Sequence, residues 1–518
     1  MAGSSFDSPT LSPGGLTTAH GDERLARVPT LTILWHPEID RVGDSFALTS
    51  KRCEVSRRAP VFGERKGGAS GAPLGDPYIS AREHSFALRE SGARVDIEPG
   101  RANANVKVNG AVLGDTVSFS RADLDRGVVI TLARRVVLCL HLARPARTPA
   151  RHDHGLVGAS DAIDDIRREI EQVAGLDVPV LIRGESGTGK GAVAAAIVAA
   201  SARAKQPYVS LNMGATVPST AASDLFGHER GSFTGANATK IGLFGAADGG
   251  SLFLDEIGVT PLDVQPMLLH VLESGEIRPL GSTRTRKVDV RFIAATDADL
   301  ERAIAAGRFS DALLQRLARY PITVPPLRDR REDFGALLVH FIRLAFEKYG
   351  EPDRLASGEE GWLSASTVAA LARHRWPGNI REIENVAGQI VLFSRGQTTA
   401  AIPPSVRALL AQDPGRASAP VASRTPDGKI SAEQVSEALA RGKGSASRAA
   451  AILGVSRTTY YELRKRNSSI RSISEIGDAE LAACRDECGG DVARMAQRLG
   501  VPLKALKDRL GRLPRSSS

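Results

Sequence analysis

The residues best suited to chemistry form a glycine-rich loop between a strand-like run, VPVLIR, and a helix-forming run, AVAAAIVAA. In this setting glycines let backbone N–H groups turn onto phosphates, and the helix dipole attracts negative charge. Lys190 then reaches the β- and γ-phosphates, whereas Gly191 offers no hydroxyl to magnesium. The pattern predicts an ATP-binding loop made of Gly184, Glu185, Ser186, Gly187, Thr188, Gly189, Lys190 and Gly191.

A pair of carboxylates ends a second strand-like run, SLFL. Carboxylates at such a position point to the ligand edge of a parallel sheet. We expect Asp255 to hold Mg²⁺, directly or through water, and Glu256 to orient or deprotonate the attacking water. The predicted cofactors are therefore ATP and Mg²⁺. A lone Asp-Glu pair usually just ends a strand, but here a phosphate loop precedes it.

The segment GSFTGA lies between these two motifs. Two glycines bracket an aromatic side chain and a hydroxyl, which is typical of a mobile loop with Phe233 and Thr234 at its tip. A plain surface turn is the alternative, and the position between two ATP motifs favours a working loop. The loop comprises Gly231, Ser232, Phe233, Thr234, Gly235 and Ala236.

Composition sets the frame for these motifs. A chain of 518 residues predicts three to four domains. No apolar run approaches the ~20 residues that span a bilayer, so we expect no membrane partner. Four cysteines in so long a chain predict a reducing, cytoplasmic location, and Cys484 and Cys488 are expected to be helix-face thiols, not zinc ligands.

Pro-rich stretches divide the chain. Linkers are predicted at 144–155 and 411–428, after a disordered lead-in at 1–30. Short apolar runs separated by turn residues predict an all-β sandwich over 31–143. Strand and helix patterns then alternate up to about residue 388, as in a parallel α/β sheet, and short helices follow residue 429.

Six segments occur in the order found in a known family: GESGTGKG, DLFGHERGSFTGA, GGSLFLDEIG, VRFIAAT, VPPLRDRREDF and HRWPGNIREIEN. They resemble the AAA+ domain of sigma-54-dependent activators, the NtrC-type bacterial enhancer-binding proteins. The resemblance implies an α/β P-loop subdomain over 156–325 and a helical lid over 326–410. It also implies a hexameric ring ATPase whose GSFTGA loop presses on the sigma-54 RNA polymerase holoenzyme.

The same resemblance assigns further roles. Asn212 matches the polar residue that links nucleotide state to the catalytic glutamate. Arg381 matches the lid arginine that senses the γ-phosphate, and Arg316 matches an arginine supplied to the neighbouring subunit. An arginine in trans can neutralise charge on the transferred phosphoryl group. A solvated helix face is the alternative for both arginines.

Two departures from the family pattern bear on turnover. Ser310 replaces the first of two trans-acting arginines, and Asp297 stands where Asn normally follows the sensor Thr296. A carboxylate near phosphate oxygens repels them. We expect retained but weakened ATPase activity; substitution of the missing arginine by Arg308, from the adjacent turn, is the alternative.

The C-terminal part is basic, with 20 Lys and Arg against 12 Asp and Glu after residue 400. Residues 429–467 have the pattern of a helix-turn-helix and resemble the Fis-type DNA-binding domain. Its second helix is expected to meet base edges and phosphates of double-stranded DNA at an upstream activating sequence. The residues concerned are Ser456, Arg457, Thr458, Thr459, Tyr460, Arg464 and Lys465. A weaker copy covers 474–514, and whether it contacts DNA is left open.

The N-terminal sandwich resembles a forkhead-associated (FHA) domain. The resemblance implies phosphothreonine recognition, because guanidinium, hydroxyl and amide groups suit phosphate. The residues that carry it are Arg57, Ser80, Arg82 and Asn109. It departs from the family pattern at Ser56 and at the extra Ala81. The implied partner is a phosphothreonine protein or a Ser/Thr kinase. Ordinary turn polarity is the alternative.

Three functions remain open at this point. The leading one is an ATP-driven activator of sigma-54 polymerase, regulated by the FHA-like domain. The second is a DNA-binding regulator whose ring hydrolyses ATP poorly, as Ser310 and Asp297 suggest. The third is an unrelated AAA+ remodeller such as a chaperone, which the GSFTGA loop and the helix-turn-helix argue against.

Overall fold

The computed structural model describes most of the chain up to residue 411 and two short helices near the C-terminus. The described residues are 27–63, 71–91, 94–101, 105–144, 150, 152–232, 237–351, 354, 362–411, 477–489, 492–499 and 506. The loop tip Phe233–Ala236 and the predicted helix-turn-helix residues Ser456–Lys465 lie outside them, as does most of the predicted lead-in. Residues 1–417 and 418–518 form two separate compact units.

The N-terminal β domain contains two antiparallel sheets with a shared core. Strands β2, β1, β10, β9, β6 and β7 lie side by side in the first sheet, and β3, β4, β5 and β8 in the second. Their bounds are β1 Val28–Trp35, β2 Ser45–Ala47, β3 Arg52–Val55, β4 Phe86–Ser91, β5 Arg94–Pro99, β6 Lys107–Val108, β7 Ala111–Val112, β8 Val117–Ser120, β9 Val128–Leu132 and β10 Val136–Ala143. A short helix, α1 (Arg121–Asp125), follows β8 and begins with a capping box at Ser120.

The central region confirms the predicted parallel α/β sheet. Its strand order is β12-β13-β16-β11-β17, and every neighbouring pair is parallel. The strands are β11 Val180–Arg183, β12 Tyr208–Asn212, β13 Ser251–Asp255, β16 Arg291–Thr296 and β17 Tyr320–Thr323. Alternate residues of one strand enter different cores, since Leu181 joins one cluster while Val180 and Ile182 join the other. Helices therefore cover both faces of the sheet.

The helices of this region divide between the two faces. Helices α2 (Asp161–Ala174) and α3 (Lys190–Ala199) pack on one face. The other core receives residues from α4 Pro218–Phe226, α5 Gly242–Ala246, α6 Gln265–Ser274, α7 Leu300–Ala305 and α8 Asp311–Leu317. A small hairpin of β14 (Glu276–Ile277) and β15 (Arg286–Lys287) follows α6.

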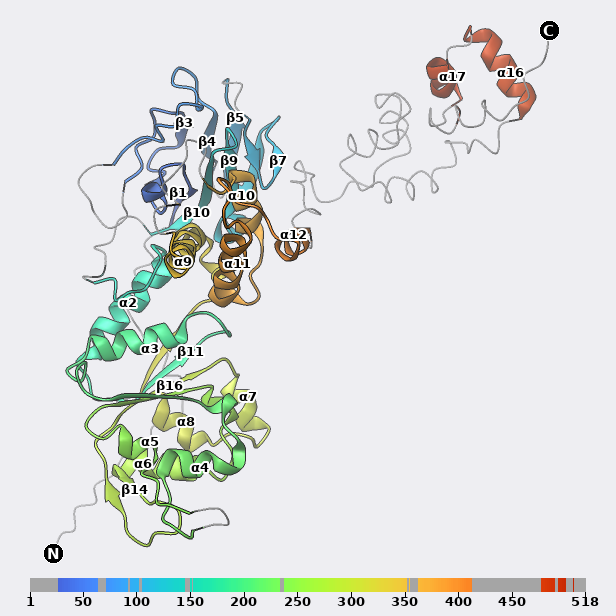
Figure 1. Ribbon diagram of the computed structural model, residues 1–518. Coiled ribbons are helices and arrows are strands. Elements are labelled where there is room, and N and C mark those ends of the chain that lie inside the picture. Colours follow the sequence, from blue (N-terminus) through green and yellow to red (C-terminus); the bar gives the residue numbers. More distant parts are fainter. Residues whose placement is uncertain are drawn as a thin grey trace, which may run out of the picture. The chain divides into compact units, whose positions relative to one another are not determined.

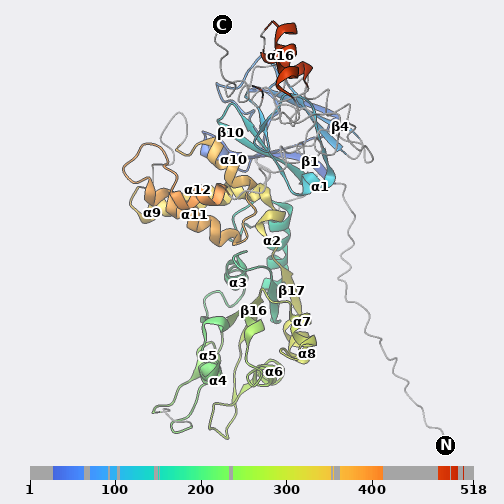
Figure 2. The same cartoon turned by 90° about the vertical axis from the view of Figure 1, so that its right-hand side faces the viewer.

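Among the residues that the structure describes between β17 and position 411, four α-helices form a lid. They are α9 Phe334–Lys348, α10 Ala365–Arg373, α11 Asn379–Phe393 and α12 Pro404–Ala411. Trp362 and Trp376 are fully buried among them, against Phe346 and Phe334. The lid core also takes in Trp35 from β1 and other residues of the first β sheet, so the β domain and the lid share one apolar cluster. Both views show lid helices beside β1 and β10 (Figures 1 and 2).

In the C-terminal unit the structure describes α16 (Asp478–Glu487) and α17 (Val492–Arg498). They share a small core that includes Cys484, whose Sγ lies 3.9 Å from Sγ of Cys488. Among the described residues no cluster of His, Cys, Asp or Glu could hold a metal ion. None of the described helices is long and apolar enough to cross a membrane.

Candidate functional site

The predicted phosphate loop connects β11 to α3, as the sequence pattern requires. Gly187 and Gly189 have φ of 77° and 102°, conformations that only glycine adopts without strain. Lys190 opens α3, and its Nζ donates to the carbonyls of Gly184 (2.8 Å) and Glu185 (3.1 Å). Burial lowers the pKa of Lys190, and nearby carboxylates oppose that shift. The loop thus has a buried cation beside a ring of backbone groups.

Three strands deliver polar residues to the edge of the sheet next to this loop. Asn212 and Asp255 end adjacent strands and pair in register. Asp255 Oδ1 accepts from the backbone N–H of Glu256 at 2.9 Å. Glu256 itself has φ of 56°, a strained conformation for a residue with a side chain. Strain of this kind is common at functional sites, and here it falls at the carboxylate that the sequence predicts to activate water.

Gly214 explains how Asn212 and Glu256 come together. A Cβ on Gly214 would lie 3.0 Å from Cδ of Glu256 and 3.2 Å from Oδ1 of Asn212. The two side chains therefore flank the same glycine. Asn212 Oδ1 also accepts from Ala215 N at 3.1 Å. The structure brings together Lys190, Asp255, Glu256 and Asn212 at one edge.

Asp297 belongs to the same edge. Its carboxylate is the largest electrostatic influence that keeps the Lys190 ammonium charged, ahead of Asp255 and Glu256. Burial is the stronger effect and lowers the Lys190 pKa overall. Because Asp297 replaces the usual Asn, a third carboxylate lies near Lys190, in addition to those of Asp255 and Glu256.

The lid lies directly on the phosphate loop. Asn379 is completely buried; its Nδ2 donates to Ser186 O (3.0 Å) and its Oδ1 accepts from Leu327 N (2.9 Å). Ile380 N donates to Gly187 O at 2.9 Å, and Arg381 Nη1 to Ser186 Oγ at 3.3 Å. The predicted sensor arginine is therefore at the loop.

Two arginines that sequence reasoning missed also bind this loop. Arg330 is 1% exposed, and its Nη2 donates to Thr188 O at 3.0 Å. Arg328 forms a two-pronged pair with Glu185, with Nη–Oε distances of 2.7 and 2.6 Å, and this pair lowers the Glu185 pKa. Both lie in the motif VPPLRDRREDF, whose repeated cations were the available signal.

Arg316 and Ser310 lie elsewhere in the subunit. Arg316 Nε donates to Leu272 O at 2.9 Å, in a pocket of about 240 Å³ beside the amino ends of β11 and β16. The phosphate loop follows the carboxyl end of β11, so Arg316 does not serve the loop of its own chain. Ser310 is the N-cap of α8, and its Oγ accepts from Leu313 N at 3.3 Å. The serine has a structural use where an arginine is typical.

The GSFTGA segment begins on an anchored hairpin. His228 exchanges backbone hydrogen bonds with Lys240 at 3.0 and 2.9 Å, and Glu229 N donates to Leu280 O at 3.0 Å. The described part of the loop ends with Gly231 and Ser232. In both views this hairpin and the β14–β15 hairpin project from the same end of the domain (Figures 1 and 2).

The predicted phosphothreonine residues of the β domain are only partly close together. Arg57 Nε donates to Ile79 O at 2.7 Å and Nη2 to Pro77 O, while Arg57 N donates to Ser80 O at 2.9 Å. Arg82 is exposed nearby in sequence. Asn109 instead forms the β6–β7 turn at φ 47°, with its Oδ1 accepting from Val129 N at 3.0 Å.

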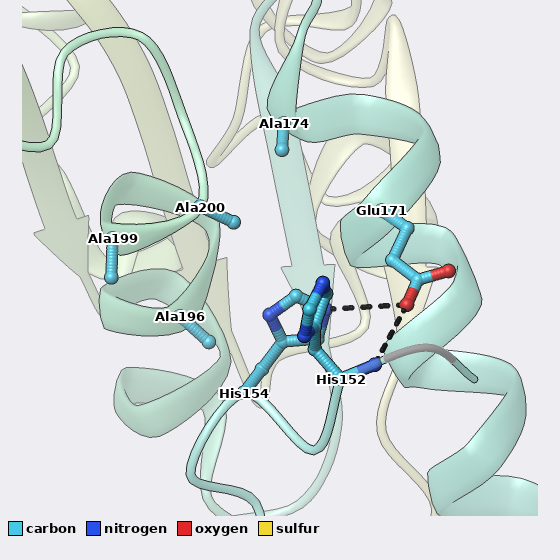
Figure 3. Close-up of a pocket in the computed structure, with 7 residues that line it drawn as sticks. All are labelled: His152, His154, Glu171, Ala174, Ala196, Ala199 and Ala200. Atoms are coloured by element: carbon cyan, nitrogen blue, oxygen red, sulfur yellow. Dashed lines mark hydrogen bonds and ion pairs between the residues drawn. The ribbon is translucent and has the colours of Figure 1, made fainter.

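A second pocket, of about 550 Å³, lies between helices α2 and α3, beside His152 and His154 (Figure 3). Alanines near the carboxyl ends of α2 and α3 line it, whereas Lys190 sits at the opposite end of α3. His154 Nε2 lies 3.8 Å from Glu171 Oε1, and His152 N donates to the same oxygen at 3.2 Å. This pocket holds none of the predicted site residues.

Comparison with known families matches the geometry. Residues 156–323 match the family described as the sigma-54 interaction domain, and residues 328–417 match the AAA+ ATPase lid domain. The central region is a sigma-54 AAA+ domain with its lid. It contains the phosphate loop, the carboxylate pair and the GSFTGA segment described above.

Curated relatives are similar to this chain over about half of its length. This chain is 45% identical over 242 residues to the DNA-binding transcriptional regulator NtrC of Salmonella typhimurium, and the match covers 47% of this chain and 50% of NtrC. The nitric oxide reductase transcription regulator NorR1 of Cupriavidus necator is 40% identical over 309 residues, 57% and 59% of the two chains. NtrX of Brucella abortus with ADP is 29% identical, with a TM-score of 0.45 over 69% of this chain and 70% of that one. The chain spans about half the length of the first of these curated relatives.

Proposed function

We propose that this protein is an ATP-driven transcription activator that remodels the sigma-54 RNA polymerase holoenzyme. The observation that carries the proposal is the anchored hairpin of GSFTGA, placed in sequence between Lys190 and Asp255 in a sigma-54 AAA+ domain. A nucleotide site alone would fit countless ATPases. The hairpin supplies a part that can push on a partner.

The residues present fit Mg²⁺–ATP. Glycine conformations in the loop free backbone N–H groups for phosphate, and Lys190 adds a cation. Asp255 offers the carboxylate oxygen that Mg²⁺ prefers. Bound Mg²⁺ supplies charge neutralisation on the transferred phosphoryl group.

Four residues of this chain have separate roles in ATP hydrolysis. Glu256, held in its strained conformation, orients the attacking water or takes its proton. Asn212 shares Gly214 with Glu256 and so links the carboxylate to the following segment. Arg381 of the lid senses the γ-phosphate. Arg316, directed away from its own loop, serves the neighbouring subunit of a hexameric ring.

The segments on either side of the AAA+ domain direct the protein to DNA and regulate it. The basic Fis-type segment, including Arg457 and Arg464, binds upstream double-stranded DNA. The β domain binds a phosphothreonine protein or a Ser/Thr kinase through Arg57, Ser80, Arg82 and Asn109. Two antiparallel sheets with a shared core support the FHA-like reading of this domain.

Open-complex formation at a sigma-54 promoter tests the proposal. We expect Thr234→Ala to abolish open complexes while ATP turnover persists, because the loop acts after hydrolysis. Ser219→Ala, which removes an exposed hydroxyl from α4, is the matched control and keeps both activities. Unchanged open-complex formation by Thr234→Ala would refute the loop's assigned role.

A second candidate is a DNA-binding regulator whose ring turns over ATP poorly. Ser310 as an N-cap and Asp297 beside Lys190 favour it. Turnover by the purified oligomer decides between the two. No measurable hydrolysis would leave the second candidate in place of the first.

A further inference from the structure

Six consecutive residues, Arg330–Gly335, contact both the α/β subdomain and the β domain. We call them the coupling segment. Toward the α/β subdomain, Arg330 holds the carbonyl of Thr188 in the phosphate loop. Asp333, fully buried, accepts from the backbone N–H groups of Ala159 (2.7 Å) and Ser160 (2.8 Å). One side of the segment is thus fixed to the nucleotide-binding subdomain.

Three other residues of the coupling segment, Arg331, Glu332 and Gly335, contact the β domain. Arg331 Nη1 donates to Gly127 O at 3.0 Å, and Glu332 Oε1 lies 3.7 Å from Nδ1 of the buried His141. Gly335 approaches the backbone of β1 so closely that a Cβ would lie 2.7 Å from Leu34 Cα. These three residues therefore tie the segment to the β domain.

An apolar interface holds the β domain in this position. The outward-facing residues of its first sheet are buried against α9 and α10, and the three tryptophans of the chain all lie in this cluster. The β-domain members are Leu34, Trp35, Ile39, Val129, Val137 and Cys139. A continuous buried cluster resembles a domain core and favours stable docking over transient contact.

We propose that the coupling segment transmits docking of the β domain to the phosphate loop, with Arg330 as a positioning residue for nucleotide. The inference rests on the proposed function, since it names how that site is regulated. When the β domain is docked, Arg331, Glu332 and Gly335 fix the segment, so Arg330 stays on the Thr188 carbonyl. Undocking releases these contacts, and the loop loses one of its buried anchors. Coupling between two sites must be reciprocal, so nucleotide also favours docking.

Gly335→Ala provides the test, because the new methyl group meets the backbone of Leu34, which cannot rotate away. Gly388→Ala is the matched control: it is the same change in lid helix α11, with nothing within 4 Å of the added Cβ. Tryptophan emission of the full chain reports docking. Amide exchange of the peptide covering 184–193 reports the phosphate loop, and calorimetry with ADP reports affinity.

For Gly335→Ala we expect red-shifted tryptophan emission, about five-fold faster exchange in the loop and about five-fold weaker ADP binding. Gly388→Ala should match the wild type in all three. In the wild type, ADP should shift tryptophan emission to the blue, since coupling is reciprocal.

Red-shifted emission with unchanged loop exchange and ADP affinity would overturn the proposal. So would unshifted emission in both Gly335→Ala and the bulkier Gly335→Leu, because docking would then not depend on this close approach. Loop exchange is measured without nucleotide. If neither the wild type nor a variant binds ADP, the proposed ATPase function fails. The exchange rates of the loop still show whether docking of the β domain affects the phosphate loop.

Discussion

The lid makes two contacts of opposite character. On the phosphate loop its contacts are hydrogen bonds and one ion pair, made by Arg328, Arg330, Asn379, Ile380 and Arg381. On the β domain its contact is a broad apolar cluster that includes Trp35. Hydrogen bonds can open and re-form with small net free energy, whereas a buried apolar face separates only at a large cost. The first contact suits a nucleotide cycle, and the second suits a persistent regulatory attachment.

Changing Glu256, the carboxylate that we propose to be catalytic, should have the largest effect at the nucleotide site. We expect Glu256→Gln to lower ATP turnover by about a thousand-fold, because an amide cannot take the proton of the attacking water. Nucleotide affinity should change little, since Lys190 and the loop remain. Glu273→Gln, on an exposed part of α6, is the control. Equal loss of turnover in both variants would argue against a special role for Glu256.

Removing the Trp35 side chain should weaken the apolar contact between the β domain and the lid. The side chain is 1% exposed in the cluster shared with the lid. We expect Trp35→Ala to lower the free energy of unfolding by about 3 kcal/mol, through lost burial and the cavity left behind. Chemical denaturation measures this. Tyr78→Ala, at a position 66% exposed, should cost far less. Similar losses would mean that the shared cluster contributes little.

The buried amide of Asn379 sharpens the comparison, because it is a single polar group at the centre of the first contact. Asn379→Ala leaves Leu327 N and Ser186 O without their partner. We expect stability to fall by about 2 kcal/mol, together with weaker nucleotide binding. Asn385→Ala, exposed on the same helix, is the matched control. A variant Asn379→Ala as stable as that control would contradict the assignment.

The sequence predicted the two contacts unequally well. Beside the phosphate loop, the placement of Lys190, Asp255 and Glu256 at one edge of the sheet was predictable, because a phosphate loop and a strand end are local patterns. Docking of the lid on the β domain was not, because Gly335 gains its meaning from Leu34, three hundred positions away. One signal was present: the run VVLCLHL in β10 is apolar without alternation, and all eight residues of that strand are buried. Unbroken apolar strands are typical of burial on both faces.

Other residues gained different roles in the structure. In the sequence, Ser310 stands where the resemblance implies an arginine. In the structure, it is the N-cap of helix α8. Asn109 reads as a phosphate ligand, and its amide oxygen serves the backbone of β9. In both cases short polar side chains near turns satisfy local backbone groups. Such uses cannot be separated from ligand binding by residue type alone.

The smallest effect is expected from the exposed pair of Arg328 and Glu185 at the rim of the polar contact. Hydrogen bonding to Arg328 lowers the Glu185 pKa below its ordinary value of 4.5. A lowered folded-state pKa stabilises the fold above the ordinary value and loses that effect as pH falls through the folded one. Both side chains are more than 40% exposed, so solvent screening keeps the contribution under about 1 kcal/mol.

Denaturation curves of Glu185→Gln and wild type, compared at pH 7 and near pH 4, check this. The small advantage of the wild type should be present at pH 7 and shrink toward pH 4, whereas the Glu273→Gln control should show no such trend. If the pair of Arg328 and Glu185 stabilised the fold by several kcal/mol at pH 7, it would instead be one of the strong contacts of the lid. The polar contact would then resist opening much as the apolar one does, and the contrast between the two would disappear.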